Sequence, residues 1–174
     1  MMKEQKLNIL LSFVFCLVSI ISFNGCHVYS FTGASISPDI KTVSILFFPN
    51  KASIVQPSLS QAFTEKLKDK FVSETSLALT KDNGDLNFEG AIIDYNTQPT
   101  AITGNDNAAL NRLTITVSVK FTNVKDSKQD FETNFSRYAD YDSHKSLSSV
   151  ETELIAQINS QLVDDIFNKA VVNW

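Results

Sequence analysis

The chain has 174 residues, enough for one domain of ordinary size and too few for two. Charged residues make up 20% and apolar residues 43%, which is typical of a globular protein and excludes a disordered chain or a multi-span membrane protein. The formal net charge is −4, and no stretch concentrates Lys and Arg. The sequence therefore lacks the basic surface that nucleic-acid binding requires, and nucleic acid is excluded as a partner.

Residues 1–25 have the pattern of an export signal. Lys3 and Lys6 precede a nearly continuous apolar run, Leu7–Phe23, which is shorter than the roughly 20 apolar residues of a membrane-spanning helix. The run ends at Gly25 and Cys26, which resemble the site at which bacterial lipoproteins are cleaved and lipidated. We expect cleavage before Cys26; an uncleaved signal anchor and cleavage elsewhere are the alternatives.

The expected mature chain begins with a lipid-bearing Cys26. Cys16 lies in the apolar run that would be removed, so the folded part would contain neither a disulfide nor a zinc site made of paired cysteines. Residues 26–40 read as lipidated cysteine and tether, and residues 41–174 as one α+β domain. Because His27 stands where an Asp would indicate inner-membrane retention in lipoproteins, we expect an outer-membrane protein, lipid-anchored on the periplasmic side.

The first elements expected are a strand and a helix. Lys41–Phe48 is apolar on both faces, which predicts a covered strand. Ser58 and Gln61 have capping-box spacing and predict that a helix begins there and ends near residue 73. Its buried face should consist of apolar residues spaced by four: Leu59, Phe63, Leu67 and Phe71.

The middle of the chain predicts further strands. Leu77–Thr80 and Asp85–Tyr95 flank the turn 81–84, whose Asn-Gly pair is a hairpin signal. A change of alternation after Gly90 predicts a bulge, with the residues of one face downstream being Ala91, Ile93 and Tyr95. The polar stretch 96–111 is expected to be a loop.

The last part of the chain predicts a hairpin and a helix. Residues 113–121 alternate cleanly between apolar and hydroxyl-bearing side chains, and 130–138 should return with Phe131, Thr133 and Phe135 inward. Ser148 and Glu151 have capping-box spacing before a helix. The order is then β-α-β-β-β-α, an α+β fold with two helices on one face of a roughly four-stranded mixed sheet. The apolar stripe expected for the last helix is Leu154, Ile155, Ile158, Leu162, Ile166, Phe167 and Ala170.

Candidate catalytic residues are sparse. Ser143 and His144 follow Asp142 directly, but a hydrolase builds its triad from separated segments around an oxyanion site, so a solvated loop is the favoured interpretation of 140–144. His27 has no ligand at metal-binding spacing, and the single glycines have no phosphate-loop context. We expect no enzyme activity, no metal and no cofactor. Most Phe residues fall on core faces, whereas Tyr29, Phe31, Phe47 and Phe48 are not assigned.

Three stretches, Cys26–Ile36, Ala101–Leu113 and Ser136–Glu151, resemble the LptE family of lipopolysaccharide-assembly lipoproteins in its Bacteroidetes form. The resemblance implies a non-catalytic partner and plug of the LptD outer-membrane β-barrel, which helps to deliver lipopolysaccharide to the outer leaflet. Only Cys26 is carried over as a functional residue, because the family's proposed basic contacts to lipopolysaccharide have no matching motif here.

A surface for such a partner is suggested by the hydroxyl-rich face of strand 113–121. Thr114, Thr116 and Ser118 alternate with apolar residues and are the candidate partner-binding residues. An alternative function is a lipid-anchored interaction or lipid-binding module of another envelope complex, which the sequence pattern alone barely separates from the first.

Overall fold

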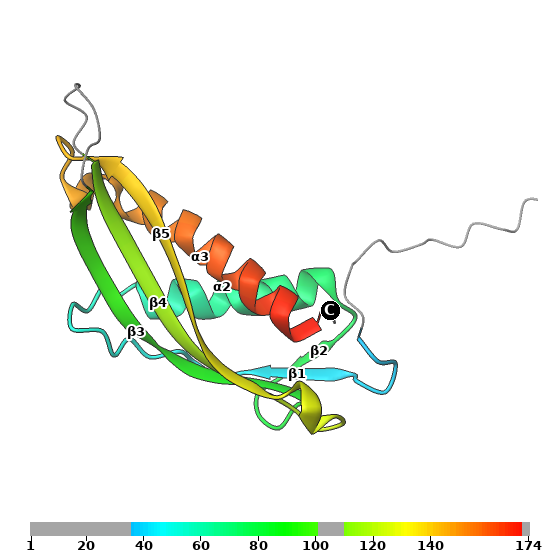
Figure 1. Cartoon of the computed structure of the whole chain (residues 1–174). Helices are drawn as coiled ribbons and strands as arrows, with labels where there is room; N and C mark the ends of the chain where they lie inside the picture. The colour runs from blue at the N-terminus through cyan, green and yellow to red at the C-terminus, as the bar shows by residue number, and fades with distance from the viewer. Residues whose placement is uncertain (1–35, 101–109, 172–174) are drawn as a thin grey trace, which may run out of the picture. The chain divides into compact units, whose positions relative to one another are not determined.

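The computed structural model describes residues 36–100 and 110–171, and Figure 1 shows their arrangement. Five strands and two long helices carry the fold, with a short 3-10 turn between the last two strands. In chain order they are β1 (Thr42–Ile45), α2 (Leu59–Glu74), β2 (Ala78–Thr80), β3 (Leu86–Thr100), β4 (Leu110–Asn123), η1 (Ser127–Gln129), β5 (Phe131–Asp142) and α3 (Leu147–Val171). The α+β class and the two helices on one face of a mixed sheet are confirmed, with five strands in place of about four.

The sheet has the order β2-β1-β3-β4-β5. Strand β1 is parallel to both of its neighbours, whereas β3, β4 and β5 are antiparallel. The predicted hairpin between β2 and β3 is wrong, because β1 lies between them. The turn 81–84 instead crosses closely over β1: a Cβ on Gly84 would lie 2.7 Å from the amide nitrogen of Ser44, so only glycine fits there.

Strand β1 is shorter than expected. It covers Thr42–Ile45, and the following Leu46 and Phe47 are 41% and 60% exposed, so only part of the predicted strand 41–48 is covered. Phe48 points the other way and is fully buried. The cause is the edge position of β2, which has three residues and shields β1 only over Thr42–Ser44.

The long strands extend into the region predicted as a loop. Residues 96–100 belong to β3 and pair with the beginning of β4, where Thr100 Oγ1 donates to the carbonyl of Leu110 at 2.9 Å. The prediction of a loop over 96–111 is therefore wrong at both ends, and residues 101–109 lie outside the described part of the chain. These strand ends are exposed or half-buried, so polar side chains there carry no sign of the backbone pairing.

The bulge in β3 lies later than predicted. The register shifts between Ile92 and Asp94, so Ile92 and Tyr95 are both buried while Ile93 is 40% exposed. The expected inward position of Ile93 is wrong. Gly90 keeps the original alternation because the ring of Phe48 occupies the space where its side chain would be: a Cβ there would lie 2.7 Å from that ring.

The core lies between the sheet and the two helices (Figure 1). The four predicted apolar residues of α2 are fully buried, and so are the inward residues of β4 up to Val119, with Phe121 at 1% exposure. The Phe71 ring lies 4.8 Å from that of Phe88 and 5.0 Å from that of Phe167, joining α2, the sheet and α3. The stripe predicted for α3 is buried as well, except for the half-buried Ala170.

Neither predicted capping box forms. Ser58 does occupy the N-cap of α2, but its hydroxyl donates to Gln56 Oε1 at 3.0 Å instead of capping the helix. In α3, Glu151 accepts hydrogen bonds from the hydroxyl of Tyr95 and from Gln56 Nε2. A buried tyrosine hydroxyl requires an acceptor, and this need determines the position of Glu151. Burial, and then the Glu151 carboxylate, raise the pKa of Tyr95.

Candidate partner-binding face

The sheet has one face that the helices do not cover, and the three candidate residues lie on it. Leu113, Ile115 and Val117 of β4 face the helices and are fully buried. Thr114, Thr116 and Ser118 alternate with them, so they share the opposite face and are half-buried between β3 and β5. The structure thus brings the three predicted residues together in one row on the open face.

The neighbouring strands continue this row with polar side chains. Thr116 lies beside Ser136 of β5, and the two hydroxyls are hydrogen-bonded at 2.9 Å. Across the strands, the register places together Asn96, Thr114 and Tyr138; then Asp94, Thr116 and Ser136; then Ala91, Ser118 and Asn134. The open face therefore offers hydroxyl and amide groups that can donate or accept hydrogen bonds.

Ion pairs frame the row at both ends. The Arg112 guanidinium makes two hydrogen bonds to Asp140, at 2.7 and 2.9 Å, and lies 3.6 Å from the centre of the Tyr138 ring. At the other end, Lys120 contacts Glu89 at 2.6 Å. The Arg112 hydrogen bonds hold the pKa of Asp140 below its usual value. These charges are paired within the face, so a partner would meet a polar surface with little net charge.

The sequence did not single out Arg112, Asp140 or Tyr138 as site residues. Arg112 and Asp140 are directly opposite in the β4–β5 register, a pairing that becomes visible only once both strands are known to extend this far. Their opposite charges at positions of the open-face alternation are the signal that could have found them.

The Asp-Ser-His cluster does not have the arrangement of a catalytic triad. Residues 140–142 belong to β5, so the solvated-loop prediction is wrong for them; Tyr141 is 9% exposed. The His144 ring contacts Asp142 at 2.7 Å rather than Ser143, and its side chain is 77% exposed. The backbone N–H of His144, and then its ring, lower the pKa of Asp142. Asp142 therefore closes a local turn, as was expected for this segment.

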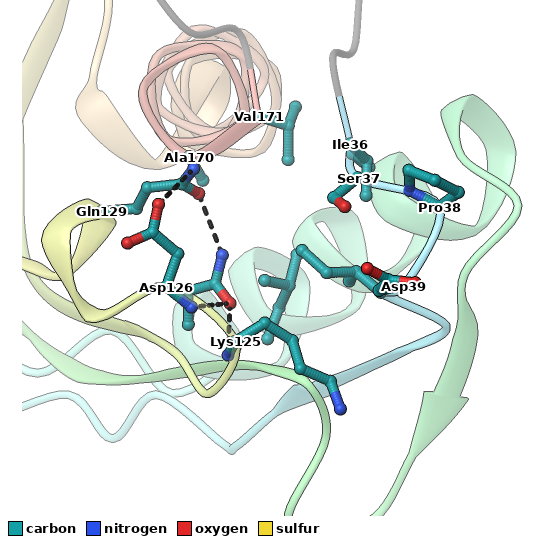
Figure 2. A pocket seen from close by; sticks show the side chains of 12 residues that line it. Ile36, Ser37, Pro38, Asp39, Lys125, Asp126, Gln129, Ala170 and Val171 are labelled. Carbon is teal, nitrogen blue, oxygen red and sulfur yellow. Dashed lines mark hydrogen bonds between the residues drawn. The ribbon is translucent and has the colours of Figure 1, made fainter.

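A hollow of about 620 Å³ lies where the expected tether enters the fold. Figure 2 shows Ile36 to Asp39 on one side of it and Lys125 and Asp126 on the other, with Val171 between them. Ile40 is only 7% exposed and belongs to the core. Cys26, the predicted lipidation site, lies outside the described residues.

Two searches of residues 36–100 and 110–171 were negative. Neither helix is long and apolar enough to cross a membrane. No group of three or more His, Cys, Asp or Glu side chains in these residues could hold a metal ion.

The chain is similar to known proteins in two ways. A family model described as "LptE: Lipopolysaccharide-assembly" matches residues 40–170, whereas no curated protein matches the sequence. A minor lipoprotein from Acinetobacter baumannii is 14% identical, with a TM-score of 0.49 over 75% of this chain and 91% of that one. A hypothetical protein from Chlamydia trachomatis is 11% identical, with a TM-score of 0.51 over 77% of this chain and 99% of that one. The second likeness concerns the fold alone. Because the family model covers β1 through nearly all of α3, the chain belongs to the LptE family of lipopolysaccharide-assembly proteins.

Proposed function

We propose that this protein is a lipid-anchored subunit of a lipopolysaccharide export complex on the periplasmic side of the outer membrane. It binds an LptD-like β-barrel as partner and plug and assists lipopolysaccharide assembly at the outer leaflet. The observation that carries the proposal is the family match over residues 40–170. The Gly25-Cys26 pair at the end of an export signal supports the anchor, with the lipid on Cys26.

The open sheet face supplies the contact with the barrel. Its row of Thr114, Thr116 and Ser118 can form hydrogen bonds with a polar wall, and its charged side chains are already paired. A polar interface of this kind needs no large apolar patch, because hydrogen bonds and bridging water satisfy both surfaces. The role is assembly and positioning and includes no change of a covalent bond.

The first experiment is purification from native envelopes in mild detergent, followed by mass spectrometry of the partners and of the N-terminal peptide. The proposal expects a large outer-membrane barrel together with a diacylated Cys26. A lipidated protein that is recovered without a barrel would contradict the export role and leave the anchor intact. An N-terminal peptide that begins elsewhere would contradict the anchor.

The choice of face is tested separately with the triple variant Thr114→Asp, Thr116→Asp and Ser118→Asp. Three added carboxylates should repel or desolvate poorly against a fitted wall, so the barrel should be lost from the purified complex. The matched control carries Gln61→Asp, Gln157→Asp and Asn168→Asp at exposed helix positions and should retain the barrel. Equal recovery with both variants would rule out this face.

The hydrolase alternative has a direct test. Ser143→Ala removes the only hydroxyl next to His144 in sequence, and we expect the variant to support lipopolysaccharide export as the wild type does. Loss of export with normal barrel binding would favour chemistry at Ser143.

A further inference from the structure

A groove runs between the two helices on the side of the helix layer that faces away from the sheet. Its first hollow has a volume of about 340 Å³ and is lined by exposed small residues as well as by core residues. We call it the α2–α3 groove; its defining residues are Gln56, Ala62, Lys66, Ile155, Ala156 and Asn159.

Asn159 makes this groove unusual. It is 2% exposed, and within the described part of the chain its Oδ1 atom has no hydrogen-bond partner. Other buried polar groups are satisfied: Thr64 Oγ1 donates to the carbonyl of Ser60 at 2.7 Å, and Asn123 Nδ2 donates to Gln129. An unpaired buried amide oxygen destabilises a protein, and a leucine at this position would avoid that cost. A donor supplied by a binding partner explains why an amide stands here.

A second hollow continues the groove and has a different character. It shares Lys66 with the first and is lined by charged side chains, including Asp69 and Asp164. Lys70 is already paired with Glu74 and Asp164, at 2.7 Å each, so the acidic side chains outnumber the available cations. A basic residue of a partner would complement this end of the groove.

The two hollows together favour an elongated occupant. They follow α2 from Ser58 to Ser73, which at 1.5 Å per helical residue is about 22 Å. An extended peptide of roughly six or seven residues has this length. A compact small molecule would fill one hollow and leave the other empty.

We propose that the α2–α3 groove binds an extended segment of the β-barrel partner, with a hydrogen-bond donor at Asn159 and a basic side chain beside Asp69 and Asp164. This inference rests on the proposed function for the identity of the partner. It adds a second contact on the side opposite the open sheet face, which agrees with a domain that a barrel surrounds.

The first test is Asn159→Leu in the full-length, detergent-purified protein. The substitution removes the unpaired amide, so the Tm of the protein without the barrel should rise by about 2–4 °C. Recovery of the barrel should fall about tenfold, because the donor of the partner loses its acceptor. A merely structural amide would instead give a lower Tm and unchanged recovery for the folded fraction, which would overturn the inference.

The second test blocks the groove without touching the core. Ala156→Trp places a large ring in the first hollow, whereas Gln157→Trp places the same ring on the neighbouring exposed position. Loss of the barrel with Ala156→Trp and retention with Gln157→Trp is the expected result. Equal recovery with wild type and both variants overturns the groove alone. Absence of the barrel even from the wild type overturns both the groove and the proposed function.

Discussion

The two faces of the sheet differ in every physical respect although the same strands build them. In β4, Leu113, Ile115 and Val117 are fully buried under the helices, while Thr114 and Thr116 between them remain half-exposed. The buried face holds its neighbours by area removed from water and by ring contacts. The open face holds only short polar side chains. The difference indicates that one face determines the stability of the fold and leaves the other free to meet a partner.

The sharpest break in this comparison is Phe71→Ala. The Phe71 ring contacts Phe88 and Phe167 in the fully buried centre, so its loss leaves a cavity and should lower the free energy of unfolding by about 3–5 kcal/mol. Thr116→Ala on the open face should change it by less than about 0.5 kcal/mol. Urea denaturation of both variants measures the difference, and similar losses would mean that the open face is not dispensable for stability.

Gly90→Ala tests how tightly the buried face is closed. A Cβ at this position would lie 2.0 Å from the carbonyl oxygen of Ser118 and 2.7 Å from the ring of Phe48. The strand must shift to admit it, which should cost about 3 kcal/mol in the free energy of unfolding. Ser118→Ala, which removes an outward hydroxyl from the same strand pair, is the control and should be nearly neutral. Thermal unfolding with equal Tm for the two variants would contradict the close approach.

A smaller effect is expected at the tyrosines of the two faces. Tyr95→Phe removes the hydroxyl that donates to Glu151 and leaves that carboxylate with Gln56, so the free energy of unfolding should fall by about 1–3 kcal/mol. Tyr138 is 50% exposed on the open face, and Tyr138→Phe should change it by less than about 0.5 kcal/mol. The contrast in denaturation midpoints checks whether Glu151 is held by this bond.

The smallest effect appears only with pH. The Asp85 carboxylate accepts hydrogen bonds from the backbone N–H of Lys41, at 2.9 Å, and from the backbone and hydroxyl of Thr42; these bonds lower its pKa. Because the folded pKa is lowered, the stabilisation is present above the unfolded value near 4 and is lost as the pH falls through the folded value. The Tm difference between the wild type and Asp85→Asn should therefore be constant above about pH 5 and shrink below about pH 4. A difference that persists unchanged into acid would exclude the carboxylate as its source.

Sequence patterns predicted the buried face well, because burial imposes a period. The four-residue spacing from Leu59 to Phe71 and the alternation from Leu113 to Phe121 both correspond to buried stripes. The family resemblance predicted the helices on one face and the order of the elements, and it agrees with the family match.

Long-range pairing was not accessible from these patterns. The Asn83-Gly84 signal describes a local turn, but it contains no information on β1, which inserts between β2 and β3. The capping boxes failed for a similar reason, since Gln56 and Tyr95 compete for the side chains that would cap the helices. The partner row was found from alternation alone, whereas the Arg112–Asp140 pair and the unpaired Asn159 amide depend on register and packing.

The bulge at Ile92 and Asp94 has a consequence for shape. A bulged strand bends and gains twist, and the long strands curve around the helices so that the open face is on the outside of the bend (Figure 1). A convex wall can follow the inside of a wider cylinder along its whole length, whereas a flat one would touch it only at its edges. One extra residue in β3 thus shapes the polar face to the curvature of the lumen that it is proposed to enter.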